Sequence, residues 1–308
     1  MPAGEHLLPM EFLANAEALS RGYKLDESLA YTRWLATHHY ENFHVVSFLL
    51  PRRLRQDFFN VYAFCRWADD LGDEVGCAEE SLRLLQWWRD QVRQMYEGRT
   101  QMPVFIALRE TVERHDLPPE PFLDLICAFE QDQVVRRYDT LDQLYQYCRY
   151  SANPVGRLVL SLCGYRDPER FRLSDATCTA LQLANFWQDV TVDLAKGRVY
   201  IPAETLARHG CAVDDVLQRR CTAQFRAAMR ELVTLTRELF DTGRPLRDMV
   251  GRRLSLDIDL FSRGGVLVLR KIERLDYDVL SVRTAISRRE RLSLLMGALA
   301  RLVLPQTA

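Results

Sequence analysis

Helix-breaking residues are sparse in this chain of 308 residues, and they separate long stretches in which apolar residues recur every three or four positions. One such stripe runs from Leu82 to Met95 and another from Leu232 to Leu239. That spacing places apolar side chains on one face of an α-helix, whereas a half-buried strand alternates. The pattern predicts an all-α fold, and residues 264–269 form one apolar run that suits a strand and a buried helix equally well.

The chain is long enough to bury a sizeable core, and its 48% hydrophobic and 27% charged residues are typical of a globular protein. No repeat of fixed period and no Pro/Ser-rich linker divides it. We therefore expect an N-terminal arm over residues 1–25 and a single helical domain over residues 26–308.

Charge and hydropathy limit the partners and the location. With 41 basic and 42 acidic residues the net charge is −1, which disfavours a nucleic-acid partner. No apolar run approaches the ~18 to 20 residues of a membrane-spanning helix, and the N-terminus lacks the basic and apolar regions of a secretion signal. The eight cysteines include no CxxC pair and indicate free thiols. We expect a cytoplasmic protein, and the mildly amphipathic C-terminus around Leu295 and Met296 leaves open a peripheral contact with the inner face of a membrane.

The first segment with a chemical signature carries Asp69 and Asp73, four residues apart, with Arg66 three residues before the pair. On a helix these side chains lie on the same face, where like charges are unfavourable unless a cation lies between them. Mg²⁺ suits this role because it takes oxygen ligands, keeps several waters and often bridges carboxylates to phosphates.

The second segment repeats polar residues every four positions along an otherwise apolar helix. The repeat consists of Asn185, Asp189 and Asp193, and Gln182 extends it by one turn. Lys196 and Arg198 follow directly and suit phosphate oxygens, since an arginine binds them as a bidentate fork.

An isolated aspartate pair at this spacing is most often a solvated helix face. Two pairs among apolar residues favour a shared chemistry, the ionisation of a diphosphate ester, in which metal ions neutralise the leaving group. An apolar cavity would then shelter the carbocation from water. Aromatic rings stabilise such a cation through their quadrupoles, although they also serve as ordinary core residues. The candidates are Phe43, Tyr62, Tyr150, Phe186 and Tyr200.

These residues lie in motifs that strongly resemble the squalene/phytoene synthase family, over about residues 30–290. The motifs are Tyr62-x₃-Arg66-x₂-Asp69-x₃-Asp73, Tyr147-Cys-Arg-Tyr150-x₃-Pro154-Val-Gly156, Gln182-x₂-Asn185-x₃-Asp189-x₃-Asp193 and Gly197-Arg198-x-Tyr200-x-Pro202. The resemblance implies an isoprenoid-synthase helical bundle around a central apolar cavity. In that family the two aspartate motifs face each other across the cavity and bind Mg²⁺ and the substrate diphosphate.

The resemblance also implies roles residue by residue. The implied Mg²⁺ ligands are Asp69, Asp73, Asn185, Asp189 and Asp193. The implied substrate or diphosphate contacts are Phe43, Arg66, Gln182, Gln188, Lys196, Arg198 and Tyr200, and Tyr62 and Tyr150 match catalytic positions that line the cavity. Asp70 lies about 100° around the helix from Asp69 and is expected only to add charge.

Three departures from the common family pattern resemble the bacterial hydroxysqualene synthases of hopanoid and squalene biosynthesis. They are Gln188 where most condensing members carry arginine, the segment 151–154, and Asn42 where many relatives have serine. This subgroup ionises presqualene diphosphate and captures the rearranged cation with water, giving hydroxysqualene and diphosphate. The resemblance therefore implies a carbon–oxygen lyase that uses Mg²⁺ and no nicotinamide, and it leaves open channelling with neighbouring squalene-pathway enzymes.

Two other functions remain as alternatives. A condensing transferase of the same fold would join two prenyl diphosphates head to head, as presqualene diphosphate, squalene, dehydrosqualene or phytoene synthases do. Gln188 and the segment 151–154 argue against it. A non-catalytic helical adaptor is the second alternative, and the two complete aspartate pairs argue against that.

Overall fold

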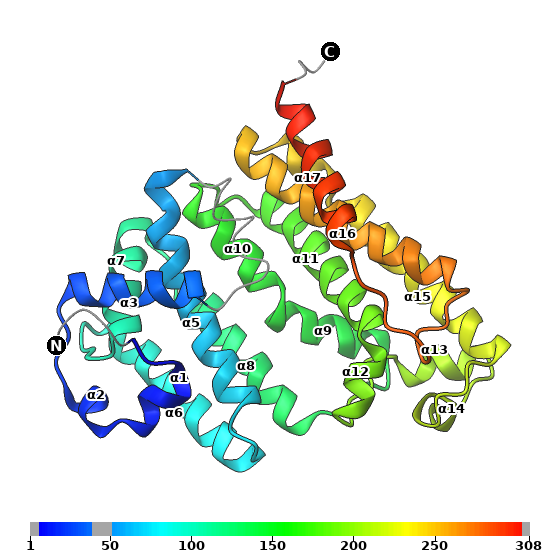
Figure 1. Ribbon diagram of the computed structural model, residues 1–308, viewed down its shortest axis with the longest axis horizontal. Helices are drawn as coiled ribbons and strands as arrows, with labels where there is room; N and C mark the ends of the chain where they lie inside the picture. The colour runs from blue at the N-terminus through cyan, green and yellow to red at the C-terminus, as the bar shows by residue number, and fades with distance from the viewer. Residues whose placement is uncertain (1–5, 39–50, 304–308) are drawn as a thin grey trace. The chain divides into compact units, whose positions relative to one another are not determined.

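The computed structural model describes residues 6–38 and 51–303, and within these ranges it is helical, with turns and connections but no strand (Figure 1). A single isolated bridge pairs Arg137 with Val199 in the described part of the chain. The predicted all-α fold is confirmed. Residues 264–269, which suited a strand or a helix, lie inside the long helix α16 (Arg252–Arg274).

The chain divides into two compact units, which are described separately. Unit 1 consists of residues 1–134 and 157–166, and unit 2 of residues 135–156 and 167–308. The change from one unit to the other falls inside helix α10 (Asn153–Leu162). The expected division into an arm and a single domain stays a prediction.

Unit 1 is built around helix α5. Its helices are α1 (Pro9–Ala14), α2 (Ala16–Ser20), α3 (Leu25–His38), η1 (Arg52–Leu54), α5 (Arg55–Asp73), α6 (Ala78–Tyr96), α7 (Pro103–His115) and α8 (Glu120–Val134). Proline at the first position of α1 and of α7 suits a helix start, because the missing N–H has no partner there in any helix. α5 packs against α3, α6, α7 and α8, so it lies at the centre of this unit.

Aromatic side chains fill the core of unit 1. Trp67 of α5 stacks on Trp88 of α6 with ring centroids 5.0 Å apart, and Phe64 meets Phe122 edge to face at 5.1 Å. Phe12 is 3% exposed and packs edge to face on Trp67 at 5.5 Å. The described part of the N-terminal segment is thus attached to this core through a buried aromatic ring, and each such ring contributes on the order of 2 kcal/mol by burial.

A buried polar contact sets the position of α5 against its neighbours. The Asn60 amide donates to the Ala107 carbonyl and to the Thr111 hydroxyl of α7, both at 2.9 Å. Its oxygen accepts from Thr32 of α3 at 2.6 Å. Buried amides are costly unless paired, so these bonds favour one register of the three helices.

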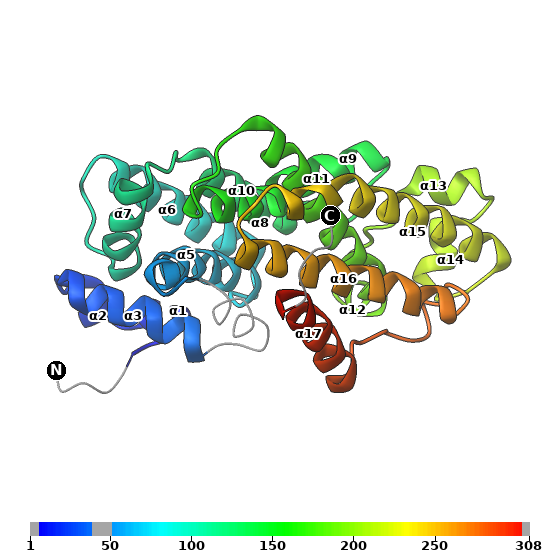
Figure 2. The same ribbon diagram turned by 90° about the horizontal axis from the view of Figure 1, so that it is seen from above.

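Unit 2 is built around helix α11. Its helices are α9 (Leu141–Ser151), α11 (Pro168–Gln188), α12 (Val190–Ala195), α13 (Ala203–Arg208), α14 (Val213–Leu217), α15 (Ala223–Gly243), η2 (Arg244–Asp248), α16 and α17 (Arg288–Val303). α11 packs along α15 and α16, as both ribbon views show (Figures 1 and 2). The Trp187 indole of α11 donates to the Thr236 hydroxyl of α15 at 2.8 Å.

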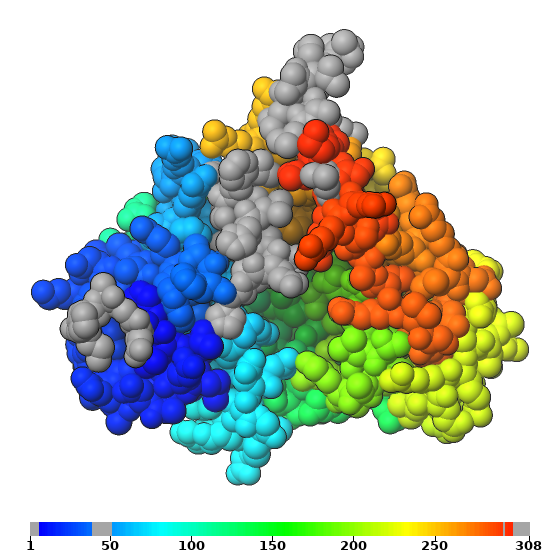
Figure 3. All heavy atoms as spheres, in the orientation of Figure 1, coloured from blue at the N-terminus to red at the C-terminus, as the bar shows by residue number. Residues whose placement is uncertain are grey.

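Close packing of α16 depends on a glycine. A Cβ at Gly265 would lie 2.3 Å from the Phe240 ring of α15 and 3.1 Å from Leu181 of α11. A larger residue there would push the three helices apart. In the space-filling view α17, in red, lies directly on the orange α16 at the surface of unit 2 (Figure 3).

Two further expectations concern cysteines and membrane helices. All eight cysteines are free thiols in the structure, as predicted, and only Cys77 is exposed. Among the described residues, no helix combines the length and the apolar character needed to cross a bilayer.

Candidate active site

The first aspartate motif occupies the last turns of α5 in unit 1. The side chain of Asp69 is 48% exposed and Asp73 is also exposed, whereas the side chain of Asp70 is 5% exposed. The i, i+4 spacing therefore places two accessible carboxylates on one face and turns Asp70 inward. This agrees with the expectation that Asp70 differs in role from its neighbours.

Arg66 is the cation of this motif. Its guanidinium lies 3.1 Å from Asp69, forms an ion pair with Asp70 and lies 3.7 Å from Glu74. Burial disfavours the charged carboxylate of Asp70 and raises its pKa to about 7, and the nearby Arg66 offsets only part of that effect. Asp70 thus binds Arg66 from the buried side of α5, and Arg66 also contacts the more exposed Asp69.

The second motif lies where α11 passes into α12 in unit 2. The sequence pattern was interpreted as one continuous helix, but α11 ends at Gln188 and α12 begins at Val190. The Val192 N–H bonds to the Asp189 carbonyl three residues back, at 2.8 Å, which tightens the turn at Asp189. The bonds from Asp189 N–H to Asn185 and from Asp193 N–H to Asp189, both 2.9 Å, persist across the break. The spacing of four therefore survives the break.

A segment that the sequence analysis missed contacts this motif. Arg283, in the α16–α17 connection (residues 275–287), donates to both carboxylate oxygens of Asp189, at 2.7 and 3.3 Å. The Gln188 amide donates to the Thr284 carbonyl at 2.7 Å. Two adjacent residues at the end of α11, Gln188 and Asp189, therefore bind two adjacent residues of the connection. The bond to Asp189 raises the pKa of the Arg283 guanidinium, which keeps it charged.

No motif could have indicated this contact. Arg283 lies 94 residues from Asp189 in the chain, outside any periodic pattern, and is one of 41 basic residues. Gln188 was singled out as a group for a diphosphate oxygen or a water. In the structure its amide is bonded to the main chain at Thr284.

The basic turn after α12 is shaped by Gly197, whose φ of 73° lies in the left-handed region that favours glycine. Lys196 is exposed and Arg198 is half-buried. The Val199 N–H, next along the chain, bonds to the Arg136 carbonyl at 2.8 Å. The turn that carries both cations is thereby attached to another part of unit 2.

Tyr200 has a packing role in the structure. Its ring stacks on Phe186 with centroids 3.8 Å apart and an interplanar angle of 8°. Tyr147 lies within 6.0 Å of both rings, and Tyr200 itself is 8% exposed. The stack attaches the chain after the basic turn to the face of α11 that ends in the second motif.

The remaining candidates lie on the expected helices. Tyr62 is half-buried on α5, Tyr150 is half-buried on α9, and Gln182 is half-buried on α11. Phe43 lies outside the described residues. Unit 1 thus brings together Arg66, Asp69 and Asp73, and unit 2 brings together Asn185, Gln188, Asp189 and Asp193.

The oxygen donors of both motifs fit Mg²⁺. In the described ranges no three His, Cys, Asp or Glu side chains form a complete metal-binding group, so neither motif is a closed cage. Mg²⁺ does not require one, because it retains waters and accepts substrate phosphates as ligands beside one or two carboxylates. The exposed carboxylates on α5 and the Asp189 carboxylate, which already binds a cationic group, have the right chemistry.

An all-α fold with aspartates paired at a spacing of four is typical of a helical isoprenoid synthase. The sequence profile of the squalene/phytoene synthase family matches residues 36–290, and the chain belongs to that family. It is 32% identical over 243 residues to a hydroxysqualene synthase of Rhodopseudomonas palustris, which covers 78% of this chain and 82% of the relative. It is 26% identical over 279 residues to phytoene synthase 2 of Solanum lycopersicum, which covers 86% and 87%.

Solved structures agree with this assignment. Squalene synthase HpnC from Alicyclobacillus acidocaldarius superposes with a TM-score of 0.80 at 45% identity, covering 82% of this chain and 95% of that one. A ligand-bound dehydrosqualene synthase superposes with the same TM-score at 23% identity and supports the fold alone. The chain is therefore an enzyme of the squalene/phytoene type.

Proposed function

We propose that the enzyme is a hydroxysqualene synthase. It would convert presqualene diphosphate and water into hydroxysqualene and diphosphate. Relatives that carry this name are 31–33% identical over most of the chain, which supports the proposal. The departures at residue 188 and in the segment 151–154 point to the same subgroup.

The residues of the two aspartate motifs would bind the metal ions. Asp69 and Asp73 in unit 1 and Asn185, Asp189 and Asp193 in unit 2 would hold Mg²⁺. Bound Mg²⁺ would supply positive charge against the departing diphosphate.

The cations of the chain would act on the same leaving group. The ion pair with Asp70 orients Arg66, which would donate to a phosphate oxygen. Lys196 and Arg198 suit the same role. Fixed donors of this kind lower the barrier because they need no reorganisation as charge develops on the leaving group.

The observation that carries the proposal is the environment of residue 188. Its neutral amide binds a main-chain carbonyl and so brings no positive charge to Asp189. A cation does lie at Asp189, but it is Arg283, on a connection between two helices. Residue 188 is therefore neutral in this chain, whereas most condensing members of the family carry a positively charged arginine there. This difference argues against the alternative function, the condensing transferase.

Product analysis tests the proposal directly. Purified enzyme is incubated with Mg²⁺ and either presqualene diphosphate or farnesyl diphosphate, and the lipids are analysed by mass spectrometry. We expect hydroxysqualene from the first substrate and no consumption of the second. Oxygen from ¹⁸O-labelled water should appear in the product. Consumption of farnesyl diphosphate would instead assign the enzyme to the condensing transferases.

Arg283 should compete with Mg²⁺ for Asp189. We expect Arg283→Gln to raise the affinity for Mg²⁺ severalfold, because the guanidinium no longer neutralises the carboxylate. Calorimetric titration of Mg²⁺ into the substrate-free enzyme measures this without turnover. Arg274→Gln removes an exposed arginine from the end of α16 and should leave the affinity unchanged. Equal affinities of the wild type and Arg283→Gln would rule out the competition.

A further inference from the structure

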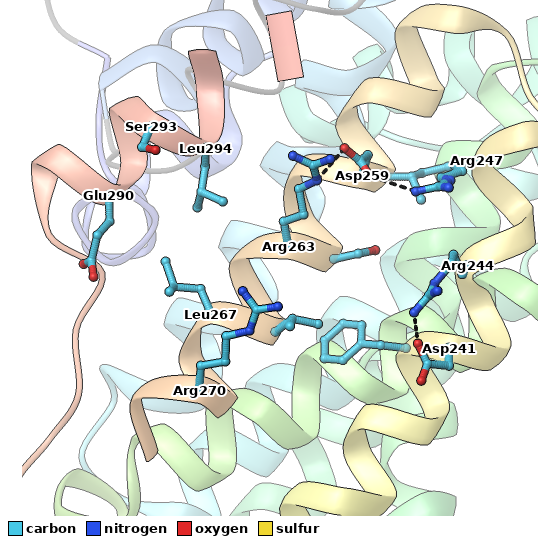
Figure 4. Close-up of a pocket in the computed structure, with 14 residues that line it drawn as sticks. Asp241, Arg244, Arg247, Asp259, Arg263, Leu267, Arg270, Glu290, Ser293 and Leu294 are labelled. Carbon is cyan, nitrogen blue, oxygen red and sulfur yellow. Dashed lines mark hydrogen bonds and ion pairs between the residues drawn. The ribbon is translucent and has the colours of Figure 1, made fainter. Parts of the chain in front are cut away.

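A groove of about 480 Å³ lies on unit 2, formed by α15 with η2, by α16 and by α17. Figure 4 shows α16 along its floor, with α17 on one side and the end of α15 with η2 on the other. All of its lining residues belong to unit 2, and none belongs to the aspartate motifs. None of the residues assigned to the proposed reaction therefore lines the groove.

Positive charge predominates in the groove. The buried carboxylate of Asp259 is shared by two guanidinium groups, Arg263 at 2.8 Å and Arg247 at 3.3 Å. Arg270 lines the same space, and no carboxylate of a described residue lies within ion-pair distance of it. Arg247 also reaches Asp248 at 3.5 Å, but that carboxylate is 60% exposed and the pair is weak.

The other acidic residues of the lining are already neutralised. Asp241 forms an ion pair with Arg244, and Glu290 binds Lys271 at 2.7 Å. Arg247 and Arg263 thus share a single buried carboxylate, and Arg270 adds a third cation to the lining. Each guanidinium carries five N–H donors, so donors remain for a further anion.

Apolar side chains cover the rest of the lining. They are Phe240, Ile258, Val266, Leu267 and Leu294. In Figure 4 Leu294 of α17 extends toward α16, where Leu267 and Arg270 lie next to each other. A site with arginines beside hydrocarbon fits a molecule that has an anionic head and an apolar chain, and it fits a small inorganic anion poorly.

The α17 wall of the groove is attached to its floor. Lys271 of α16 donates to the Ala285 carbonyl at 2.7 Å as well as binding Glu290. The Glu290 carboxylate also accepts the Ser287 N–H at 2.7 Å, and these bonds lower its pKa to about 2. It therefore stays charged at any physiological pH, and the start of α17 stays on α16.

We propose that this groove binds the headgroup of an anionic phospholipid at a membrane surface. The phosphate would accept hydrogen bonds from Arg263 and Arg270, and part of an acyl chain would lie on Leu267 and Leu294. Arg288, Arg289 and Arg291 are exposed on the first turns of α17, beside the groove. Basic side chains in this position are attracted to an anionic leaflet, so the groove would face the membrane. The proposal is independent of the reaction that the enzyme catalyses.

Soluble short-chain lipids separate a headgroup site from general charge attraction. The probes are dihexanoyl phosphatidylglycerol below its micelle concentration, dihexanoyl phosphatidylcholine and inorganic phosphate, each titrated calorimetrically into the full chain. We expect binding of phosphatidylglycerol alone, weakened about tenfold in Arg270→Gln and further in Arg263→Gln/Arg270→Gln. Arg270→Gln breaks no ion pair among the described residues, so the fold should not change.

Matched variants and vesicles complete the test. Arg83→Gln/Arg93→Gln removes two exposed arginines from α6 in unit 1 and should bind phosphatidylglycerol as the wild type does. Vesicles that contain phosphatidylglycerol should sediment the wild type and the α6 variant, but much less of the groove variants. The proposal would be overturned if both double variants lost binding equally, or if no binding were seen at all. It would also be overturned if phosphatidylcholine or inorganic phosphate bound as tightly as phosphatidylglycerol.

Discussion

Asp69→Asn and Asp189→Asn should each lower kcat by about a hundredfold or more while leaving the protein folded. Each change keeps the size of the side chain and removes the charge of a proposed Mg²⁺ ligand. Losses of about this size are typical when one fixed contact to developing charge is removed from an active site. The side chain of Asp69 is about half exposed, and Arg66 keeps its ion pair with Asp70 after the change. Steady-state turnover of presqualene diphosphate at saturating Mg²⁺ measures the effect.

Surface aspartates of the same units provide controls. Asp90→Asn on α6 and Asp214→Asn on α14 remove solvent-accessible carboxylates that lie outside both motifs and should keep full activity. Circular dichroism and thermal unfolding verify that all four variants fold. Near-normal rates in both motif variants would show that the assignment of the metal ligands is wrong.

The unfolding free energy should fall as the pH rises from about 4 to about 8, and Asp257→Asn should remove a large part of that decrease. Asp257 lies on α16 and is 4% exposed, and neither of its oxygens has a hydrogen-bond partner among the described residues. Burial raises its pKa from 3.8 to about 7.

The sign of this effect follows from proton binding. Between pH 4 and pH 7 the unfolded state has released the Asp257 proton while the native state still binds it, so raising the pH favours unfolding. A difference of about three pKa units corresponds to at most about 4 kcal/mol at pH 8. Asp70, whose pKa is also raised to about 7, contributes with the same sign, so Asp257→Asn should leave a smaller slope.

Urea unfolding of wild type and Asp257→Asn at pH 5 and pH 8 checks this. The unfolding free energy of Asp257→Asn minus that of the wild type should be larger at pH 8 than at pH 5. Asp214→Asn, which removes an exposed carboxylate, should show the same difference from wild type at both values. A stability difference between Asp257→Asn and wild type that does not change with pH would contradict the prediction.

The helices and the local geometry of the motifs were predictable because they depend on contacts between near neighbours in the chain. Apolar spacing of three and four identified the all-α fold, and a spacing of four placed Asp69 with Asp73 on one face of α5. The same geometry separated Asp70 from Asp69 by about 100° around the helix, but its burial is known only from the structure. The break at Asp189 was missed, because one hydrogen bond across three residues interrupts α11 without changing the periodic pattern.

Contacts between segments that are distant in the chain could not be predicted from the sequence. Gln188 was chosen from its place in a motif, but its partner is a main-chain carbonyl at Thr284, to which no side-chain pattern could point. Tyr200 was expected to bind substrate, and its ring is stacked in the aromatic cluster of unit 2. The groove on α16 likewise requires three helices that are separated in the sequence.

The sequence by itself determined the helical class, the family and the residues that form the two aspartate motifs, because helix periodicity and motif spacing are local properties of the chain. Only the tertiary structure decided that Arg283 binds Asp189 and that Arg247 and Arg263 share Asp259. It also decided that Asp257 is buried with no hydrogen-bond partner among the described residues. The physical reason is that burial and charge pairing depend on which helices pack together. That packing is a sum of many weak contacts between distant segments, and no single stretch of sequence encodes it.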